Sequence, residues 1–250
     1  MDALSLTFSS GWASGINAYL VVLVLGISDR VGTVAEIPDV LGRWDVLAAA
    51  GFLYAMEFIA DKIPYIDSTW DAISTAIRPT AGAVIGVLLA GEASSLDQAV
   101  LGVVGGGTAL LSHLAKAGGR LAINTSPEPA SNVLASLTED ATVLAVVWFS
   151  LEHPRAAAAV AGVLLLLGLV MLFLLSRLVR RGWRRWKAGP ARAGAGGPVV
   201  SLALVVLRRC MIAAADLILS LSQDAVVAQS RLDFGWTGRP LGRAIWNGID

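Results

Sequence analysis

Ionisable side chains recur at helical spacing inside or beside the apolar segments of this 250-residue chain. Glu57 and Asp61 are four residues apart, so they share one helix face. His113, Lys116 and Arg120 follow one another at intervals of three and four residues and share a second face. A carboxylate and an imidazole that meet in a low-dielectric cluster could carry a proton or hold a cation. We therefore assign functional roles to Glu57 and His113, which lie deepest in their segments.

Charged side chains inside a membrane normally face the interior of the helix bundle and pair with one another. Arg78 and the adjacent acids Glu139 and Asp140 border other apolar segments of the chain. Two sets of pairs are predicted: Glu57 and Asp61 with His113 and Lys116, and Arg78 with Glu139 and Asp140.

Simpler structural roles are an alternative for several of these residues. Lys62, Lys116 and Arg120 would each interact favourably with the negative dipole at the C-terminal end of a helix. Glu139 completes a capping box that begins three residues earlier, and it would then mark only the start of a helix. For Lys62, Arg120 and Asp140 we prefer these simpler roles.

Two uncharged polar residues, Asn17 and Thr108, lie near the middles of apolar segments, just after Gly-rich stretches. Small residues let helices approach closely, and the polar side chain would then line a pathway near the centre of the bilayer. The alternative is a helix–helix hydrogen bond, which contributes less than about 1 kcal/mol on average. The glycines of GVVGGG, 102–107, indicate close helix packing rather than a nucleotide-binding loop.

The composition is that of an integral membrane protein. Hydrophobic residues make up 56% of the chain, charged residues 15%, and the mean hydropathy is +0.69, which is too apolar for a soluble domain. The net charge of zero argues against a nucleic-acid partner. Zinc-ligand spacing, a nucleophile elbow and a phosphate-binding loop are absent from the sequence, and Asp61, Asp67 and Asp71 match no known metal loop. We therefore predict neither a metal nor a cofactor.

The elements that position these residues are helices, so we predict an all-α polytopic membrane protein with about six transmembrane helices. The apolar segments run approximately over residues 6–27, 46–60, 80–91, 99–115, 137–151 and 156–176. The third is shorter than the roughly 20 residues that a span needs, so it must join the turn before Arg78-Pro79 as a broken or kinked helix. A short interfacial helix capped by Asp67 would precede it.

Basic residues decide the orientation of the helices in the membrane. The segment Arg177–Arg192 holds seven of them, so it should be cytoplasmic and bind anionic lipid. Counting back through six spans places both termini in the cytoplasm of a multi-pass protein of the cytoplasmic (inner) membrane. Beyond the membrane domain we predict a flexible linker over 188–198, an amphipathic interfacial helix over 199–223, whose rival is a seventh span, and a cytoplasmic tail over 224–250.

The membrane domain, residues 1–187, contains signs of an internal repeat. GWASGINAYL, 11–20, aligns with GVVGGGTALL, 102–111, at an offset of 91 residues. Units 1–95 and 97–187 would each hold three spans and insert with opposite orientations, which is the plan of many transporters. Matches among Ala, Val, Gly and Leu also arise by chance in membrane proteins.

Several longer strings are specific, among them GWASGINAYL, MEFIADKIPYIDS, AIRPTAGA, SPEPASN and SLTED. Through these strings the chain, over roughly residues 8–180, resembles the bacterial membrane family catalogued as domain of unknown function 4126. Many members carry an arginine where this chain has Asn17, so the chain departs from the family pattern at that position. The family is functionally uncharacterised, and the resemblance implies no activity, substrate or site residue.

Three functions are compatible with these patterns. The first is a small-solute or ion transporter or channel in which Glu57 or His113 changes protonation during the cycle. The second is a non-catalytic membrane scaffold or assembly factor with a structural charged cluster, and homo-oligomers fit either function. The third, which we weigh least, is a metal-dependent enzyme acting on lipid head groups, so we expect no enzyme. The candidate pathway residues are Asn17, Glu57, Asp61, Arg78, Thr108, His113, Lys116, Glu139 and Asp140.

Overall fold

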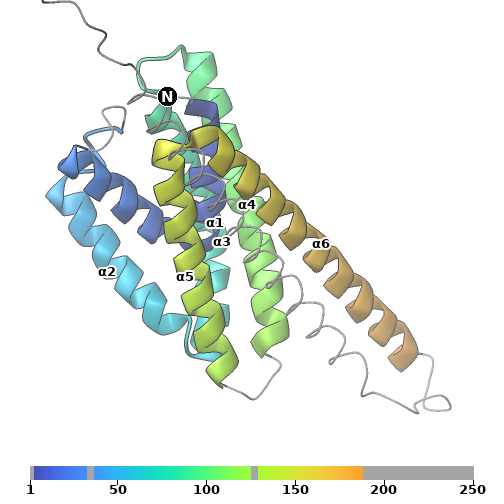
Figure 1. Ribbon diagram of the computed structural model, residues 1–250. Coiled ribbons are helices and arrows are strands. Elements are labelled where there is room, and N and C mark those ends of the chain that lie inside the picture. Colours follow the sequence, from blue (N-terminus) through green and yellow to red (C-terminus); the bar gives the residue numbers. More distant parts are fainter. Residues whose placement is uncertain (1–2, 33–36, 125–128, 188–250) are drawn as a thin grey trace, which may run out of the picture. The chain divides into compact units, whose positions relative to one another are not determined.

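The structure is a computed structural model that describes residues 3–32, 37–124 and 129–187. Its contacts divide the chain into two units, 1–200 and 201–250, and every described residue lies in the first. All regular elements of the described residues are α-helices, which confirms the all-α prediction. In chain order they are α1 (Ala3–Val31), α2 (Trp44–Ala60), α3 (Pro64–Ala90), α4 (Ser95–Asn124), α5 (Pro129–Glu152) and α6 (Pro154–Lys187) (Figure 1). The predicted linker, interfacial helix and tail, 188–250, lie outside the described residues.

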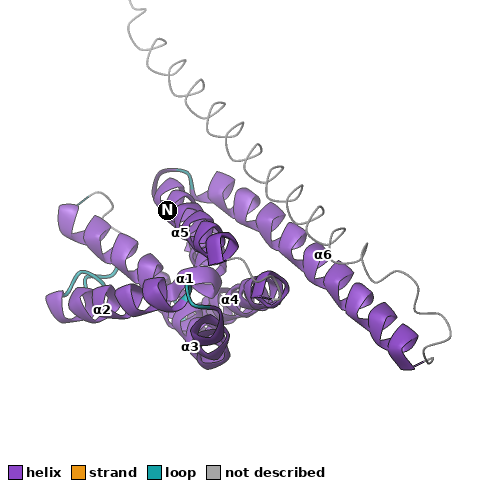
Figure 2. Cartoon of the chain, turned by 90° about the horizontal axis from the view of Figure 1, so that it is seen from below, coloured by secondary structure: helices purple, strands orange, loops and turns teal. Residues whose placement is uncertain are grey.

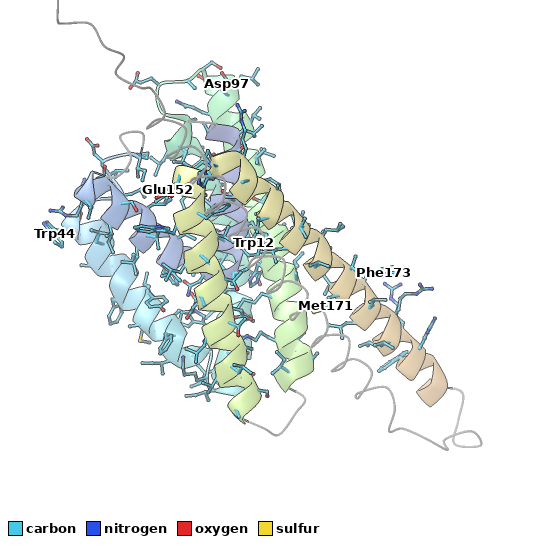
Figure 3. All side chains as sticks on the ribbon, viewed as in Figure 1. Trp12, Trp44, Asp97, Glu152, Met171 and Phe173 are labelled. Atoms are coloured by element: carbon cyan, nitrogen blue, oxygen red, sulfur yellow. The ribbon has the colours of Figure 1, made fainter. Side chains whose placement is uncertain are left out.

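Five of the described helices, α1, α3, α4, α5 and α6, are long and apolar enough to cross a membrane. The chain is therefore a multi-pass membrane protein, as predicted. Helix α2 has 17 residues, about 26 Å at 1.5 Å per residue, which is shorter than the hydrocarbon core of about 30 Å. Asp97 and Glu152 mark the α3–α4 and α5–α6 turns, which lie at the same end of the helices, as alternate crossings require (Figure 3). Which end faces the cytoplasm stays a prediction.

Helix α1 contacts each of the other five helices and is the most buried of the membrane-length helices; Figure 2 shows it between α2, α3, α4 and α5. Glycines allow this close approach. A Cβ at Gly15 would collide with the Ala109 carbonyl and the Ser112 hydroxyl of α4, and one at Gly82 of α3 would collide with the Gly105 carbonyl. Helices α1, α3 and α4 thus form a tightly packed core, and the GVVGGG stretch packs helices as predicted.

Helix α3 includes the residues before Pro79, as predicted, and runs without interruption through this proline, so a broken helix is wrong and a kink stays a prediction. Pro64 occupies the first turn, where a missing N–H is harmless, so Asp67 lies inside the helix and caps no separate element. Further along, Pro79 again lacks an N–H, so the carbonyl of Thr75 loses its helical donor. Membrane helices tolerate proline where neighbouring helices and Ser or Thr side chains satisfy the backbone groups.

Both α4 and α5 extend beyond the apolar segments that predict them. Helix α5 begins at Pro129, so Ser136 is buried inside it and the predicted capping box is wrong. Helix α4 continues to Asn124 and carries Lys116 and Arg120 within its length. A span predicted from hydropathy stops at the first charged residue. Here the charged side chains pair inside the bundle, so the helices continue past them.

Candidate functional site

Helix α1 is interrupted at Asn17, whose φ of −150° and ψ of 93° are not helical. In a continuous helix the Leu20 N–H would bond to the Ile16 carbonyl. Here the Leu20 N–H donates instead to the side-chain oxygen of Asn17 at 3.0 Å. The Ile16 carbonyl accepts from Lys116 Nζ at 3.0 Å. The break therefore replaces a backbone hydrogen bond by one polar side chain and one cation.

Arg78 of α3 reaches the same break from the other side. Its guanidinium donates to Glu57 Oε1 at 2.7 Å, lies 3.2 Å from Asp71 Oδ1, and donates to the Gly15 carbonyl at 3.4 Å. The arginine is 1% exposed and the glutamate 0% exposed, so water does not screen this pair. Such a buried cation is tolerable only because two carboxylates and a carbonyl face it.

Hydrogen bonds fix the charge state of His113. Its Nδ1 lies 2.8 Å from the Arg78 guanidinium, which can only donate, so Nδ1 must accept and carries no proton. Its Nε2 lies 2.9 Å from the Thr75 hydroxyl, which donates to the Asp71 carbonyl at 2.9 Å. The imidazole is therefore neutral, with its proton on Nε2 and directed to Thr75. A second proton on Nδ1 is disfavoured, because it would point at the positively charged guanidinium of Arg78.

A second part of the network surrounds two cations of α4. Lys116 Nζ lies 3.1 Å from Asp61 Oδ2, and 3.4 Å from both Glu57 Oε1 and Glu139 Oε2. Arg120 donates to both oxygens of Glu139, at 2.7 and 3.1 Å, and its guanidinium lies 3.2 Å from Asp61 Oδ2. The bidentate geometry of Arg120 with Glu139 is the strongest arrangement for such a pair.

Asp140 of α5 is held differently from the other acids. The side-chain amide of Asn17 donates to Oδ1 at 2.9 Å, and the Tyr54 hydroxyl of α2 donates to Oδ2 at 3.4 Å. Both donors are neutral. Within the described part of the chain, none of the ion pairs includes Asp140. Asp140 is thus a partly buried carboxylate without a counter-ion, placed directly at the break in α1.

Negative charge exceeds positive charge in this cluster. We use the name charged network for three cations, Arg78, Lys116 and Arg120, and five carboxylates, Glu57, Asp61, Asp71, Glu139 and Asp140. With His113 neutral and the acids ionised, the carboxylates exceed the cations by two. The buried oxygens Glu57 Oε2 and Asp61 Oδ1 also lack a hydrogen-bond partner. The network can accept positive charge.

The structure confirms some predicted pairs and corrects others. Lys116 pairs with Glu57 and Asp61 as predicted, but His113 contacts Arg78 and Thr75 rather than these acids. The predicted pairing of Arg78 with Glu139 and Asp140 is wrong, because this arginine contacts Glu57 of α2 and His113 of α4 instead. Glu139 is held by the two cations of α4.

The simpler roles hold for one of the three residues to which we assign them. Lys62 Nζ donates to the Phe58 carbonyl at the end of α2, as a residue that complements a helix terminus does. Arg120 and Asp140 belong to the network, so the simpler role is wrong for both. The Thr108 hydroxyl donates to carbonyls of its own helix and takes no part in the network.

Three members of the site are missing from the candidate pathway residues predicted from the sequence. Asp71 and Thr75 share a face with Arg78, at spacings of seven and three residues, and this periodicity could have identified them. Tyr54 precedes Glu57 by three residues on α2, but its contact with Asp140 depends on how α2 and α5 are placed. Among the described residues, no group of three or more His, Cys, Asp or Glu side chains is arranged to hold a metal ion.

Comparison with known proteins places the chain in a family. The family model described as domain of unknown function 4126 matches residues 4–174, a range that includes every residue of the charged network. No match was found among curated proteins or among solved structures. The description of the family names no activity, so any function must be argued from the site itself.

Proposed function

Because the chain belongs to the family of domain of unknown function 4126, which has no assigned activity, we propose its function from the geometry: a small-solute or ion transporter or channel. Its polar pathway passes the charged network at the break in α1. The observation that carries this proposal is the interruption at Asn17, where a carbonyl of α1 meets a buried cation. In many transporters, broken helices of this kind present backbone groups and side chains to solutes near the middle of the bilayer.

The energetics of the network favour a functional role over a structural one. A charged residue at the centre of a membrane helix costs roughly 2.5 to 3.5 kcal/mol on insertion scales. Replacing buried ion pairs by well-packed apolar side chains is often neutral or stabilising. A bundle that needed only stability would therefore be served as well by apolar residues at the eight positions of the network. Helix packing alone does not require them.

The inverted-repeat hypothesis supports the same function and stays a prediction. Each predicted unit contributes three helices, α1–α3 from 1–95 and α4–α6 from 97–187. The charged network lies between the two units, with Arg78 and Glu57 from the first and Lys116 and Glu139 from the second. We further propose that the protein resides in the cytoplasmic membrane with the basic end of α6 in the cytoplasm. The start of α1 lies at the other end of the helices (Figure 1), which does not fit the prediction that both termini are cytoplasmic. Its oligomeric state and the absence of enzymatic activity stay predictions.

Flux measurements test the proposal. The purified full-length chain is reconstituted into proteoliposomes, and uptake of labelled cations, anions and small metabolites is measured for the wild type and two variants. Glu57→Gln removes a buried charge from the network and should abolish flux. Glu152→Gln neutralises an exposed acid at the end of α5, outside the network, and should leave flux unchanged. If no class of solute crosses with the wild type, the transport proposal is rejected.

A membrane scaffold is the second candidate, and one feature of α6 favours it. This helix has 34 residues, about 51 Å, which exceeds the hydrocarbon core by roughly 20 Å. Phe173 projects away from the other helices (Figure 3), and Arg177, Arg180 and Arg181 beyond it are exposed. This basic end would bind anionic lipid or a partner. A partner that co-purifies with the full chain and is lost on deleting residues 188–250 would support the scaffold.

A further inference from the structure

The cations of the charged network have little capacity for another anion. Lys116 has three N–H donors, and four oxygen atoms lie within 3.4 Å of its Nζ. Arg120 is shared by Asp61 and Glu139. The Nε of Arg78 lacks a hydrogen-bond partner, but this residue is 1% exposed and already faces two carboxylates. An incoming anion would meet occupied donors and an excess of negative charge.

Asp140 is the place in the network where positive charge is missing. Among the described residues, its oxygens accept hydrogen bonds only from the Asn17 amide and the Tyr54 hydroxyl. The nearby ammonium of Lys116 is engaged by other oxygens, as described above. A carboxylate held by neutral donors inside a membrane is stabilised by a proton or by a bound cation.

The surroundings of Asp140 also suit a cation. Helix α1 contributes the neutral Asn17, α2 contributes Tyr54 and the acid Glu57, and α5 contributes the adjacent acid Glu139. The positive charge of this region comes from Lys116 of α4 and from Lys62, which follows α2. Asp61, also after α2, adds a further negative charge. The unpartnered oxygens of Glu57 and Asp61 lie in the same network and add acceptors.

One face of α2 connects Asp140 with the end of the helix. Tyr54, Phe58 and Lys62 follow one another at intervals of four residues, and all three are partly exposed. The rings of Tyr54 and Phe58 are 6.0 Å apart, and Lys62 Nζ lies 3.0 Å from the centre of the Phe58 ring. The Phe58 ring already accommodates one ammonium group, which shows that this face tolerates a cation.

From these contacts we infer that the species bound in the pathway is a monovalent cation, a proton included, and that Asp140 binds it at the break in α1. This inference rests on the proposed transport function and narrows its substrate class. Asn17 and Tyr54 orient the carboxylate, and neutralisation of Asp140 changes the hydrogen bond that joins α5 to the interrupted segment of α1. Binding and the geometry of the break are thereby linked.

Binding is tested without transport, on the purified full-length protein in detergent. Thermal unfolding is followed in Na⁺, in K⁺ and in a bulky organic cation at equal ionic strength, since a ligand that binds the folded state raises Tm. The proton is tested by infrared difference spectra between acidic and alkaline pH, which report the carboxylic acid C=O band. We expect one of these responses in the wild type. Asp140→Asn should remove it, or weaken cation affinity about tenfold or more, equivalent to about 1.4 kcal/mol.

Two further variants keep the test decisive. Glu152→Gln neutralises an exposed acid on the same helix and should respond as the wild type does. Tyr54→Phe removes one donor to Asp140 but retains the ring, so it should weaken binding even if Asp140→Asn fails to fold. A wild type that responds to no cation and no pH change overturns the inference, as does an undiminished response in both Asp140→Asn and Tyr54→Phe.

The two proposals can fail separately. Cation binding at Asp140 without flux in proteoliposomes would reject the transporter and leave the cation site standing. Flux of an anion that is unaffected by Asp140→Asn would leave the transporter standing and overturn the cation site. Loss of both binding and flux in Asp140→Asn, with both retained in Glu152→Gln, supports the two proposals together.

Discussion

Neutralising Arg78 should destabilise the protein more than neutralising its partner Glu57. The two groups form the most buried ion pair of the network, at 2.7 Å and with exposures of 1% and 0%. Removing one member of a buried pair costs about 3 to 5 kcal/mol, because the other member is left without compensation. For a pair in isolation, the two substitutions would have similar effects. The surrounding charges make them unequal.

The magnitudes follow from the remaining neighbours. In Glu57→Gln, Arg78 keeps Asp71 and Lys116 keeps Asp61, and the excess of negative charge falls from two to one. We therefore expect Glu57→Gln to lower the free energy of unfolding by about 3 kcal/mol, the lower end of the range. In Arg78→Gln, Asp71 loses its cation and the excess rises to three. We therefore expect Arg78→Gln to lower the free energy of unfolding by about 5 kcal/mol. In the double variant the loss should be smaller than the sum by about 2 kcal/mol, because the two charges disappear together.

The measurement is equilibrium unfolding in mixed micelles, followed by far-ultraviolet circular dichroism for the wild type, both single variants and the double variant. Glu152→Gln serves as the control and should lie within about 0.5 kcal/mol of the wild type, because this acid is exposed. A loss of stability for Glu57→Gln that equals or exceeds the loss for Arg78→Gln would refute the excess of negative charge in the network. Additive losses would show that the two groups do not interact.

Three other predictions test the packing, the break and the membrane contact. Gly15→Ala should lower the free energy of unfolding by about 3 kcal/mol, because the added Cβ collides with the backbone of α4. Gly107 has open space around it, so Gly107→Ala should leave the free energy of unfolding unchanged or raise it by up to about 1 kcal/mol in the same assay. Asn17→Ala should lower the free energy of unfolding by about 1 to 2 kcal/mol and reduce flux, because the two hydrogen bonds of the Asn17 side chain disappear. Unchanged stability would show that the break in α1 needs no side chain. Replacing Arg177 and Arg180 by glutamine should weaken the dependence of Tm on anionic lipid; an unaltered lipid response would contradict a role for the basic end.

Much of the network could be predicted from local spacing. His113, Lys116 and Arg120 share a face of α4 as their intervals require, and Lys116 meets Glu57 of α2 and Asp61 just after it. Helical periodicity is a property of the chain itself, so residues on one face come together whichever helix they meet. The choice of partner is different. Arg78 pairs with α2 rather than α5 because the rotation and height of each helix are set by packing against its neighbours.

The sequence by itself determined that this protein is an all-helical membrane protein, because hydropathy and length depend only on composition along the chain. It also determined which side chains share a helix face. Only the tertiary structure decided that α3 continues through Pro79 while α1 breaks at Asn17. Whether a helix survives a missing hydrogen bond depends on which neighbouring groups satisfy its backbone. Lys116 comes from 100 residues away to meet the Ile16 carbonyl, and no local pattern encodes that contact.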